Sequence, residues 1–309
     1  MHPMPAVAPS PSDPSAREVL ASFRGQPHDF VPAGAHKLAY RRFGRGPDLV
    51  FVHGWPLHAA TFRALIPLLA PRFTCHLFDL PGSGQTESPA GAPVDLASHA
   101  VALRVAADAL GLRSYGLVAH DSGGFSGRLL AATDPRVVAL VSGDTEIPGH
   151  MPDIIKTLLL AAKTPGGADV MRMSFRSRAM RRSDIGFAGC FADLKHIDGD
   201  FHELLVAPLL ASRAAFMRQV EILRSAVDIE APLRAAHAAI EVPVLFLWGD
   251  ADPIFPLEKA RAMLPALKRA RLEVLREARC FHHEERAPEF ATLAAPFLAD
   301  AFAPGRGQA

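Results

Sequence analysis

The residues best suited to chemistry lie in a run from 117 to 128, which reads Leu-Val-Ala-His-Asp-Ser-Gly-Gly-Phe-Ser-Gly-Arg. Apolar residues predict a buried strand over 115–118, and a helical pattern follows from residue 124. A sharp turn between a strand and a helix can present one side chain at its tip in a strained backbone conformation. Asp121 stands at the tip of this predicted turn. A carboxylate is already ionised at neutral pH, so Asp121 could act as a nucleophile without a base.

The residues that flank Asp121 suit such a turn, because the strand and helix backbones nearly touch there and leave room only for small side chains. Ala119 lies two positions before Asp121, and Gly123 lies two positions after it. If Ser122 stood at the tip instead, the bulky His120 would take the first flanking position. The spacing therefore favours a carboxylate nucleophile over a hydroxyl, and over the alternative in which Asp121 only caps the following helix.

Strand and helix patterns that would position this turn alternate along most of the chain. Apolar runs predict strands at 49–52, 74–80, 115–118, 137–142, 242–248 and 272–275, and helical spacing falls at 59–69, 96–110, 124–133, 256–264 and 287–302. This alternation predicts an α/β fold with a mostly parallel sheet and helices on both faces.

Between residues 148 and 241 the pattern changes, because no buried strand is visible and apolar residues recur with helical spacing. The first residues are rich in Pro, Ala and Ser. We therefore predict a disordered tail over 1–26, a core over 27–147 and 236–309, and an inserted helical cap over 148–235. A cap over the strand ends would enclose a pocket and exclude water.

Composition limits the classes of function. The 309 residues include 33 Lys and Arg against 32 Asp and Glu, which gives no electrostatic reason to bind nucleic acid or an anionic membrane. No apolar stretch is long enough to cross a bilayer. Cys75, Cys190 and Cys280 are too few and too far apart for a disulfide framework. We expect a cytoplasmic monomer or homodimer whose partner is a small-molecule substrate.

Four motifs, each at the end of a predicted strand, give the chain a resemblance to the α/β-hydrolase family. They are His-Gly-Trp-Pro at 53–56, Asp-Leu-Pro-Gly-Ser-Gly at 79–84, the turn at 119–123, and Gly-Asp-Ala-Asp-Pro at 249–253. With an aspartate at the tip of the turn, the chain resembles the branch that contains epoxide hydrolases and haloalkane dehalogenases. The resemblance implies that Asp121 attacks an electrophilic carbon to form an aspartyl ester, which a histidine-activated water then hydrolyses.

The resemblance also implies roles for residues around the nucleophile. The backbone N–H groups of Trp55 and Ser122 would form the oxyanion hole. The acid that orients the histidine would be Asp252, just past a buried strand, with Asp144 as the alternative. Four further residues are expected at the pocket, namely His53, His120, Cys280 and Phe281.

The histidine implied by the resemblance does not fall at its usual place. Counting from the last predicted strand puts that place at Cys280, and counting back from the proline of the last helix puts it at Phe281. We expect a shifted loop to bring His283, or else His282, to Asp252. The alternative is a broken triad, in which the ester forms but is not hydrolysed.

The substrate subclass stays open at this point. The cap segment has no tyrosine to donate a proton to an epoxide, and Ser122 stands where haloalkane dehalogenases carry a halide-binding tryptophan. Methionines and phenylalanines in the cap favour a small to medium, largely apolar substrate. No metal or organic cofactor is implied. Two alternatives remain: an ester hydrolase that uses Ser122, and a non-catalytic member of the fold that binds a ligand in the capped pocket.

Overall fold

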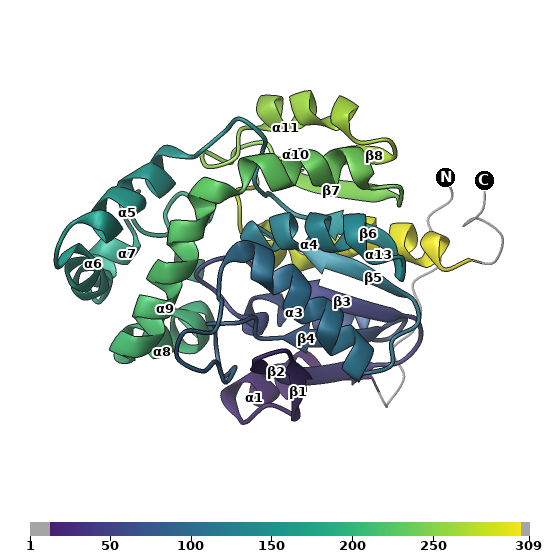
Figure 1. Ribbon diagram of the computed structural model, residues 1–309, viewed down its shortest axis with the longest axis horizontal. Coiled ribbons are helices and arrows are strands. Elements are labelled where there is room, and N and C mark those ends of the chain that lie inside the picture. The colour runs from purple at the N-terminus through teal and green to yellow at the C-terminus, as the bar shows by residue number, and fades with distance from the viewer. Residues whose placement is uncertain (1–12, 304–309) are drawn as a thin grey trace.

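The computed structural model describes residues 13–303, and its centre is one eight-stranded sheet of order β1-β2-β4-β3-β5-β6-β7-β8 (Figure 1). The pairs β1–β2 and β2–β4 are antiparallel, and the other neighbouring pairs are parallel. The strands are β1 (Asp29–Ala33), β2 (His36–Gly44), β3 (Asp48–Val52), β4 (Thr74–Phe78), β5 (Tyr115–Ala119), β6 (Val137–Ser142), β7 (Val244–Gly249) and β8 (Ala270–Leu275). The predicted α/β fold with a mostly parallel sheet is confirmed.

Helices cover both faces of this sheet, as the alternating pattern predicts. The core helices are α1 (Ala16–Arg24), α2 (Ile66–Leu69), α3 (Leu96–Ala109), α4 (Ser122–Thr133), α11 (Leu257–Met263), α12 (His282–Glu285) and α13 (Ala287–Ala301). Helices α3 and α4 pack together in front of the sheet in Figure 1, whereas α13 lies behind it against β6 and β7. Strands β5 and β7 are buried at every residue because they lie inside the sheet between these layers.

The first part of the described chain is more ordered than expected. Helix α1 forms because Ser15 and Glu18 make a reciprocal capping box, and because Val19 and Phe23 are buried. The prediction of a disordered tail over 1–26 is therefore wrong for this stretch, while residues 1–12 lie outside the described part. Strands β1 and β2 also lie where the sequence pattern predicts no strand.

The segment between β6 and β7 is a helical insert, most of which lies beyond one end of the sheet, whereas its last helix packs against the core (Figure 1). Its helices are α5 (Asp153–Lys163), α6 (Gly167–Phe175), α7 (Arg178–Arg181), α8 (Ala207–Ala211), α9 (Arg213–Arg224) and α10 (Glu230–Ala239). Phe187, Phe191 and Phe201 of the insert pack around Phe281 of the core. The insert is thus attached to the core beside the loop that follows β8.

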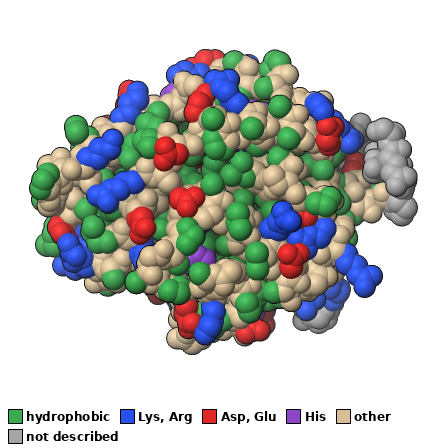
Figure 2. Space-filling model, viewed as in Figure 1, with side chains coloured by type: hydrophobic (Ala, Val, Ile, Leu, Met, Phe, Trp, Pro, Cys, Tyr) green, Lys and Arg blue, Asp and Glu red, His purple; other side chains and the backbone are tan. Residues whose placement is uncertain are grey.

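Acidic and basic side chains are interspersed on the face displayed in Figure 2, in keeping with the formal net charge of +1. Within residues 13–303, every helix is too short or too polar to cross a membrane.

Candidate active site

The predicted sharp turn between β5 and α4 is present, and Asp121 lies at its tip with φ 52° and ψ −137°. A positive φ is strained for a residue that carries a side chain, and it persists only where the surrounding structure enforces it. The N–H of Asp121 donates to the carbonyl oxygen of Asp144 over 2.8 Å. A side chain at Gly123 would collide with the carbonyl oxygens of Val52 and His53, so the turn needs glycine at that position.

The Asp121 carboxylate is held by the two backbone N–H groups that were expected to form an oxyanion hole. Ser122 N and Trp55 N both donate to Asp121 Oδ1, the latter over 3.3 Å. Trp55 N also donates to Ser122 Oγ over 2.9 Å. One carboxylate oxygen therefore occupies the position between the two N–H groups.

The charge state of Asp121 depends on opposing influences. Burial raises the pKa of its carboxyl group to about 7, and the negative charge of Glu146 contributes to the rise. The N–H groups of Ser122 and Trp55 oppose the rise, because they favour the ionised form. The group therefore changes its charge near neutral pH.

Asp121 and Ser122 border a cavity of about 850 Å³ of empty space, part of which is open to solvent. Its described titratable lining residues are Asp121, Glu146, His150 and Cys190. Most of the wall is apolar and comes from both the core and the insert, including Leu96, Met151, Ile155, Phe187, Ile222 and Phe281. Such a wall suits an apolar ligand.

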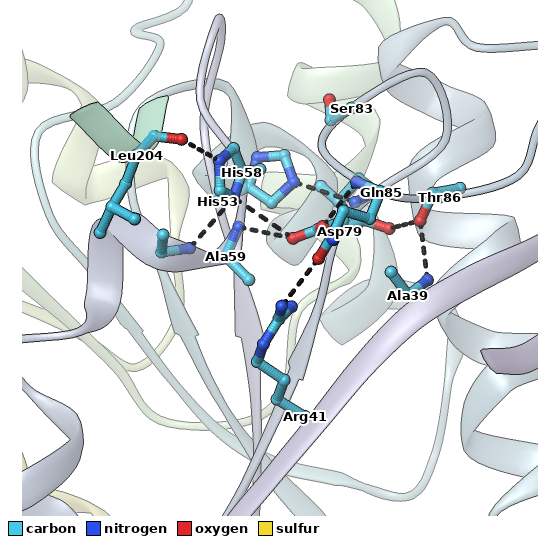
Figure 3. Close-up of polar contacts among 12 residues, drawn as sticks. Ala39, Arg41, His53, His58, Ala59, Asp79, Ser83, Gln85, Thr86 and Leu204 are labelled. Carbon is cyan, nitrogen blue, oxygen red and sulfur yellow. Dashed lines mark hydrogen bonds and ion pairs between the residues drawn. The ribbon is translucent and has the colours of Figure 1, made fainter. Parts of the chain in front are cut away.

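The loop that carries Trp55 is fixed by a buried network centred on Asp79 (Figure 3). Asp79 Oδ1 accepts a hydrogen bond from Ala59 N over 3.1 Å, and Oδ2 accepts one from Gln85 N over 2.9 Å. Burial alone would raise the pKa of Asp79, but nearby His58 and the N–H group of Gln85 hold it below its ordinary value. Asp79 therefore stays ionised and orders the loop against the ends of the strands.

Three imidazoles lie behind the turn, and none of them lines the cavity. His282 Nε2 lies 2.6 Å from Asp144 Oδ2. His283 Nε2 lies 2.7 Å from Thr61 Oγ1, and its ring centroid lies 3.9 Å from that of His120. Burial lowers the pKa of His282 to about 4 and that of His120 to about 3, so both rings are neutral at pH 7.

The expected pairing of His283 with Asp252 is not among the hydrogen bonds of residues 13–303. Asp252 Oδ1 instead accepts from Ile254 N over 2.7 Å. Burial, together with the charge of Asp144, raises the pKa of Asp252 well above its ordinary value. The physical reason is that α12 begins at His282, directly after Phe281, and turns both histidines into the core. Among residues 13–303, Asp144 is the expected acid that lies within ion-pair distance of a histidine. Asp252 acts on His282 only through its charge, which opposes the lowering of the His282 pKa by burial.

Of the four further residues expected at the pocket, only Phe281 is part of the cavity wall. His120 Nε2 donates to the carbonyl oxygen of Cys280 over 2.9 Å and lies 3.6 Å from Cys280 Sγ. His53 Nε2 accepts from Leu80 N over 2.9 Å. His53, His120 and Cys280 are thus buried beside the cavity, where they join the loops around it.

Sequence reasoning missed Glu146 and Cys190, which both line the cavity. Glu146 comes four residues after the end of β6, in the same polar stretch as Asp144. An acidic residue at that position could have been predicted as a site residue from the sequence, because the carboxyl ends of the central strands face the site. Cys190 belongs to the insert, and no motif marks it.

The order of the strands, the strained turn after β5 and the insert after β6 are those of the α/β-hydrolase fold, which this chain adopts. The family model described as the alpha/beta hydrolase fold matches residues 47–172. The matched stretch runs from the start of β3 into the insert and contains the Asp121 turn.

The chain is also similar to particular proteins. A pimeloyl-(acyl-carrier protein) methyl ester esterase of Aeromonas hydrophila is 28% identical over 241 residues, which cover 74% of this chain and 85% of the esterase. The crystal structure of haloalkane dehalogenase DbeA from Bradyrhizobium elkani is 25% identical, with a TM-score of 0.74 over 88% of this chain and 97% of that one. A membrane phospholipase A described as a bacterial virulence factor is 24% identical, with a TM-score of 0.72 over 92% and 89%. These proteins share the fold but differ in the reactions that their names describe.

Proposed function

We propose that this protein is a hydrolase that acts on a small to medium, largely apolar electrophile through an ester on Asp121. The observation that carries the proposal is the Asp121 carboxylate, which sits on a strained turn at an apolar cavity with Oδ1 between the N–H groups of Trp55 and Ser122. Alkylation would convert this carboxylate into an ester whose carbonyl oxygen already lies between those groups. When water adds to the ester carbon, the same N–H groups would stabilise the oxyanion.

Ser122 is the second candidate nucleophile, because it borders the same cavity and the relatives include an esterase. Ser122 opens helix α4 and does not occupy the tip of the turn. Among the hydrogen bonds of residues 13–303, its hydroxyl group has no imidazole partner, and it accepts from Trp55 N. A serine nucleophile needs an adjacent base to activate it, so this environment favours Asp121.

Isotope labelling tests the proposal. The protein is incubated with an apolar 1-bromoalkane or epoxide in water enriched in oxygen-18, and the peptide that contains Asp121 is analysed by mass spectrometry. We expect either an alkyl ester on Asp121 or, after turnover, oxygen-18 in its carboxylate. Asp121→Asn should lower product formation on the order of 10³-fold or more, because the nucleophile is removed.

Ser122→Ala is the matched control, because it keeps the backbone N–H group and removes only the hydroxyl. We expect this variant to form the same adduct. An acyl group on Ser122 from an activated ester, with Asp121 unlabelled, would contradict the proposal and favour the serine-type esterase. Saturable ligand binding with neither adduct nor label would favour a binding protein.

A further inference from the structure

The reaction proposed for Asp121 needs a second group that moves protons, and the buried imidazoles do not reach the cavity. His150 lines the cavity, but its Nδ1 accepts from Lys259 Nζ and its Nε2 donates to the carbonyl oxygen of Ile254, each over 2.9 Å. Both of its ring nitrogens are therefore occupied. Burial raises the pKa of the Cys190 thiol well above its ordinary value, so that group stays protonated. Of the titratable lining residues besides Asp121, Glu146 is left.

The Thr145 hydroxyl group can form a hydrogen bond with the Glu146 side chain whether Glu146 is ionised or protonated. Glu146 Oε2 lies 2.8 Å from Thr145 Oγ1 and 3.8 Å from Arg128 Nη2. Thr145 Oγ1 also lies 2.8 Å from the carbonyl oxygen of Asp121, and it accepts from Arg128 Nη2 over 2.8 Å. When Glu146 is ionised, the Thr145 hydroxyl can donate to it. When Glu146 is protonated, the hydroxyl can turn to the Asp121 carbonyl oxygen and accept from the acid.

The two carboxyl groups share one apolar cavity, which disfavours two negative charges at once. Burial raises the pKa of Glu146, and the charge of Glu146 contributes to the raised pKa of Asp121. A charge on one carboxyl group therefore disfavours a charge on the other. A carboxylic acid that borders the same cavity as the nucleophile is able to protonate an oxygen leaving group.

Neither indole N–H group of the protein is free to bind a halide leaving group. The chain has two tryptophans, and both indole N–H groups are taken by carbonyl oxygens. Trp55 Nε1 donates to Gln219 O, and Trp248 Nε1 donates to Phe255 O, each over 2.8 Å. An oxygen leaving group protonated by a carboxylic acid fits the site better than a halide ion.

We propose that Glu146 is the acid–base residue of this site and that the substrates are apolar epoxides, an inference that rests on the function proposed for Asp121. Glu146 takes the place of the cap tyrosines that the sequence lacks and of the imidazole that does not reach the cavity. This assigns a catalytic role to a residue that no motif in the sequence marks.

Together, the proposed steps add one water molecule to an epoxide and release a diol. An Asp121 oxygen forms a bond to an epoxide carbon, the carbon–oxygen bond of the ring breaks, and the Glu146 proton moves to the released oxygen. The Glu146 carboxylate then takes a proton from a water molecule whose oxygen adds to the ester carbon. The oxyanion between Trp55 N and Ser122 N collapses, and the diol oxygen leaves with the proton from Glu146. The second proton of the water molecule, now on the Asp121 carboxylic acid, passes to the Glu146 carboxylate, which restores the starting state of both groups.

Glu146→Gln tests this role, because it should change two reactions in opposite directions. We expect ring opening of an apolar epoxide, followed as single-turnover ester formation on Asp121, to slow by about 100-fold or more, because the proton donor is lost. Alkylation by a 1-bromoalkane at pH 6 should become several-fold faster, because removing the charge of Glu146 lowers the pKa of Asp121. Cys280→Ala is the matched control, since Cys280 stands near the usual histidine position but outside the cavity wall, and we expect it to leave both rates within about twofold.

The proposal would be overturned if Glu146→Gln opened the epoxide at a rate near that of the unsubstituted protein. It would also be overturned if the rates of epoxide opening and of bromoalkane alkylation fell equally. The unsubstituted protein provides a second measurement that needs no variant. Its epoxide rate should fall at high pH, where Glu146 is ionised, while its bromoalkane rate stays high. Parallel pH profiles would also overturn the proposal. If neither reagent labels Asp121 in the unsubstituted protein, the proposed function itself fails.

Discussion

At the scale of single residues, the site is governed by the environment of one carboxyl group. Asp121 is surrounded by apolar residues and lies near Glu146, which favours its neutral form, whereas two backbone N–H groups favour its ionised form. The outcome is a pKa of about 7, higher than an exposed aspartate would have. Burial thus makes the carboxylate a stronger base and nucleophile while reducing the fraction that is ionised at neutral pH.

The rate of alkylation should therefore depend on pH. A 1-bromoalkane needs no proton for its leaving group, so its reaction should follow the ionised fraction of Asp121. With the pKa of Asp121 at about 7, that fraction and the single-turnover rate should rise about tenfold between pH 6 and pH 8. Rates measured by mass spectrometry over this range check the prediction. A rate that is already constant above pH 5 would show that the environment does not raise this pKa.

At the scale of elements, the geometry depends on the close approach of β3, β5 and α4. Strand β3 pairs with β5 up to the Val52–Ala119 pair, so the loop after β3 meets the turn after β5 at the same edge of the sheet. Gly54 and Gly123 leave room for this contact, because a side chain at Gly54 would collide with Asp121 and one at Gly123 with Val52. The two N–H groups at Asp121 come from these two segments.

Gly123→Ala should strongly destabilise the protein. The added methyl group would meet the carbonyl oxygens of Val52 and His53, and neither backbone can move without displacing the loop that carries Trp55. We expect the free energy of unfolding, measured by urea titration, to fall by about 2 kcal/mol or more. Gly25→Ala is the control, because its added methyl group would have only ordinary contacts at 3.7 Å. Equal losses in the two variants would contradict the steric explanation.

At the scale of the whole molecule, the insert and the core form the cavity together, so the contact between them helps to shape it. The loop after β8 is part of this contact. Phe281 N donates to Cys190 O over 2.8 Å, and Glu285 accepts from Ala192 N and Asp193 N over 2.9 and 2.7 Å. Phe281 therefore lines the cavity, and Phe281 and Glu285 both hold the insert in place.

Glu285→Ala should loosen the insert without unfolding the core. Loss of two hydrogen bonds to a carboxylate should speed hydrogen exchange of the Ala192 and Asp193 amides by about tenfold or more, while the central strands keep their protection. Glu289→Ala is the control, since Glu289 pairs with Arg286 on the surface and does not contact the insert. Unchanged hydrogen exchange at residues 192 and 193 would show that contacts other than those of Glu285 hold the insert against the core.

The spacing of apolar residues along the sequence predicts much of the fold. Strands β3 to β7 follow from apolar runs, because burial on both faces imposes this pattern on the sequence. Helices α3, α4 and α13 follow from helical spacing, and β8, a partly exposed edge strand, follows only in its second half. The turn at Asp121 also follows, because small residues at fixed offsets are a steric requirement. The apolar pattern does not predict β1 and β2, because they are antiparallel strands at one edge of the sheet and β2 carries charged residues among its apolar ones.

The partners of the histidines were decided only by the tertiary structure. The sequence by itself determined that a carboxylate stands at the tip of the turn and that the usual histidine position holds no imidazole. It did not determine that His283 would contact Thr61, that His282 would contact Asp144, or that Glu146 would border the cavity. The two histidine contacts join segments far apart in the sequence, so they depend on how helices and loops pack rather than on local spacing. Glu146 follows the end of β6, but the cavity that it borders exists only because the insert packs over that end of the sheet.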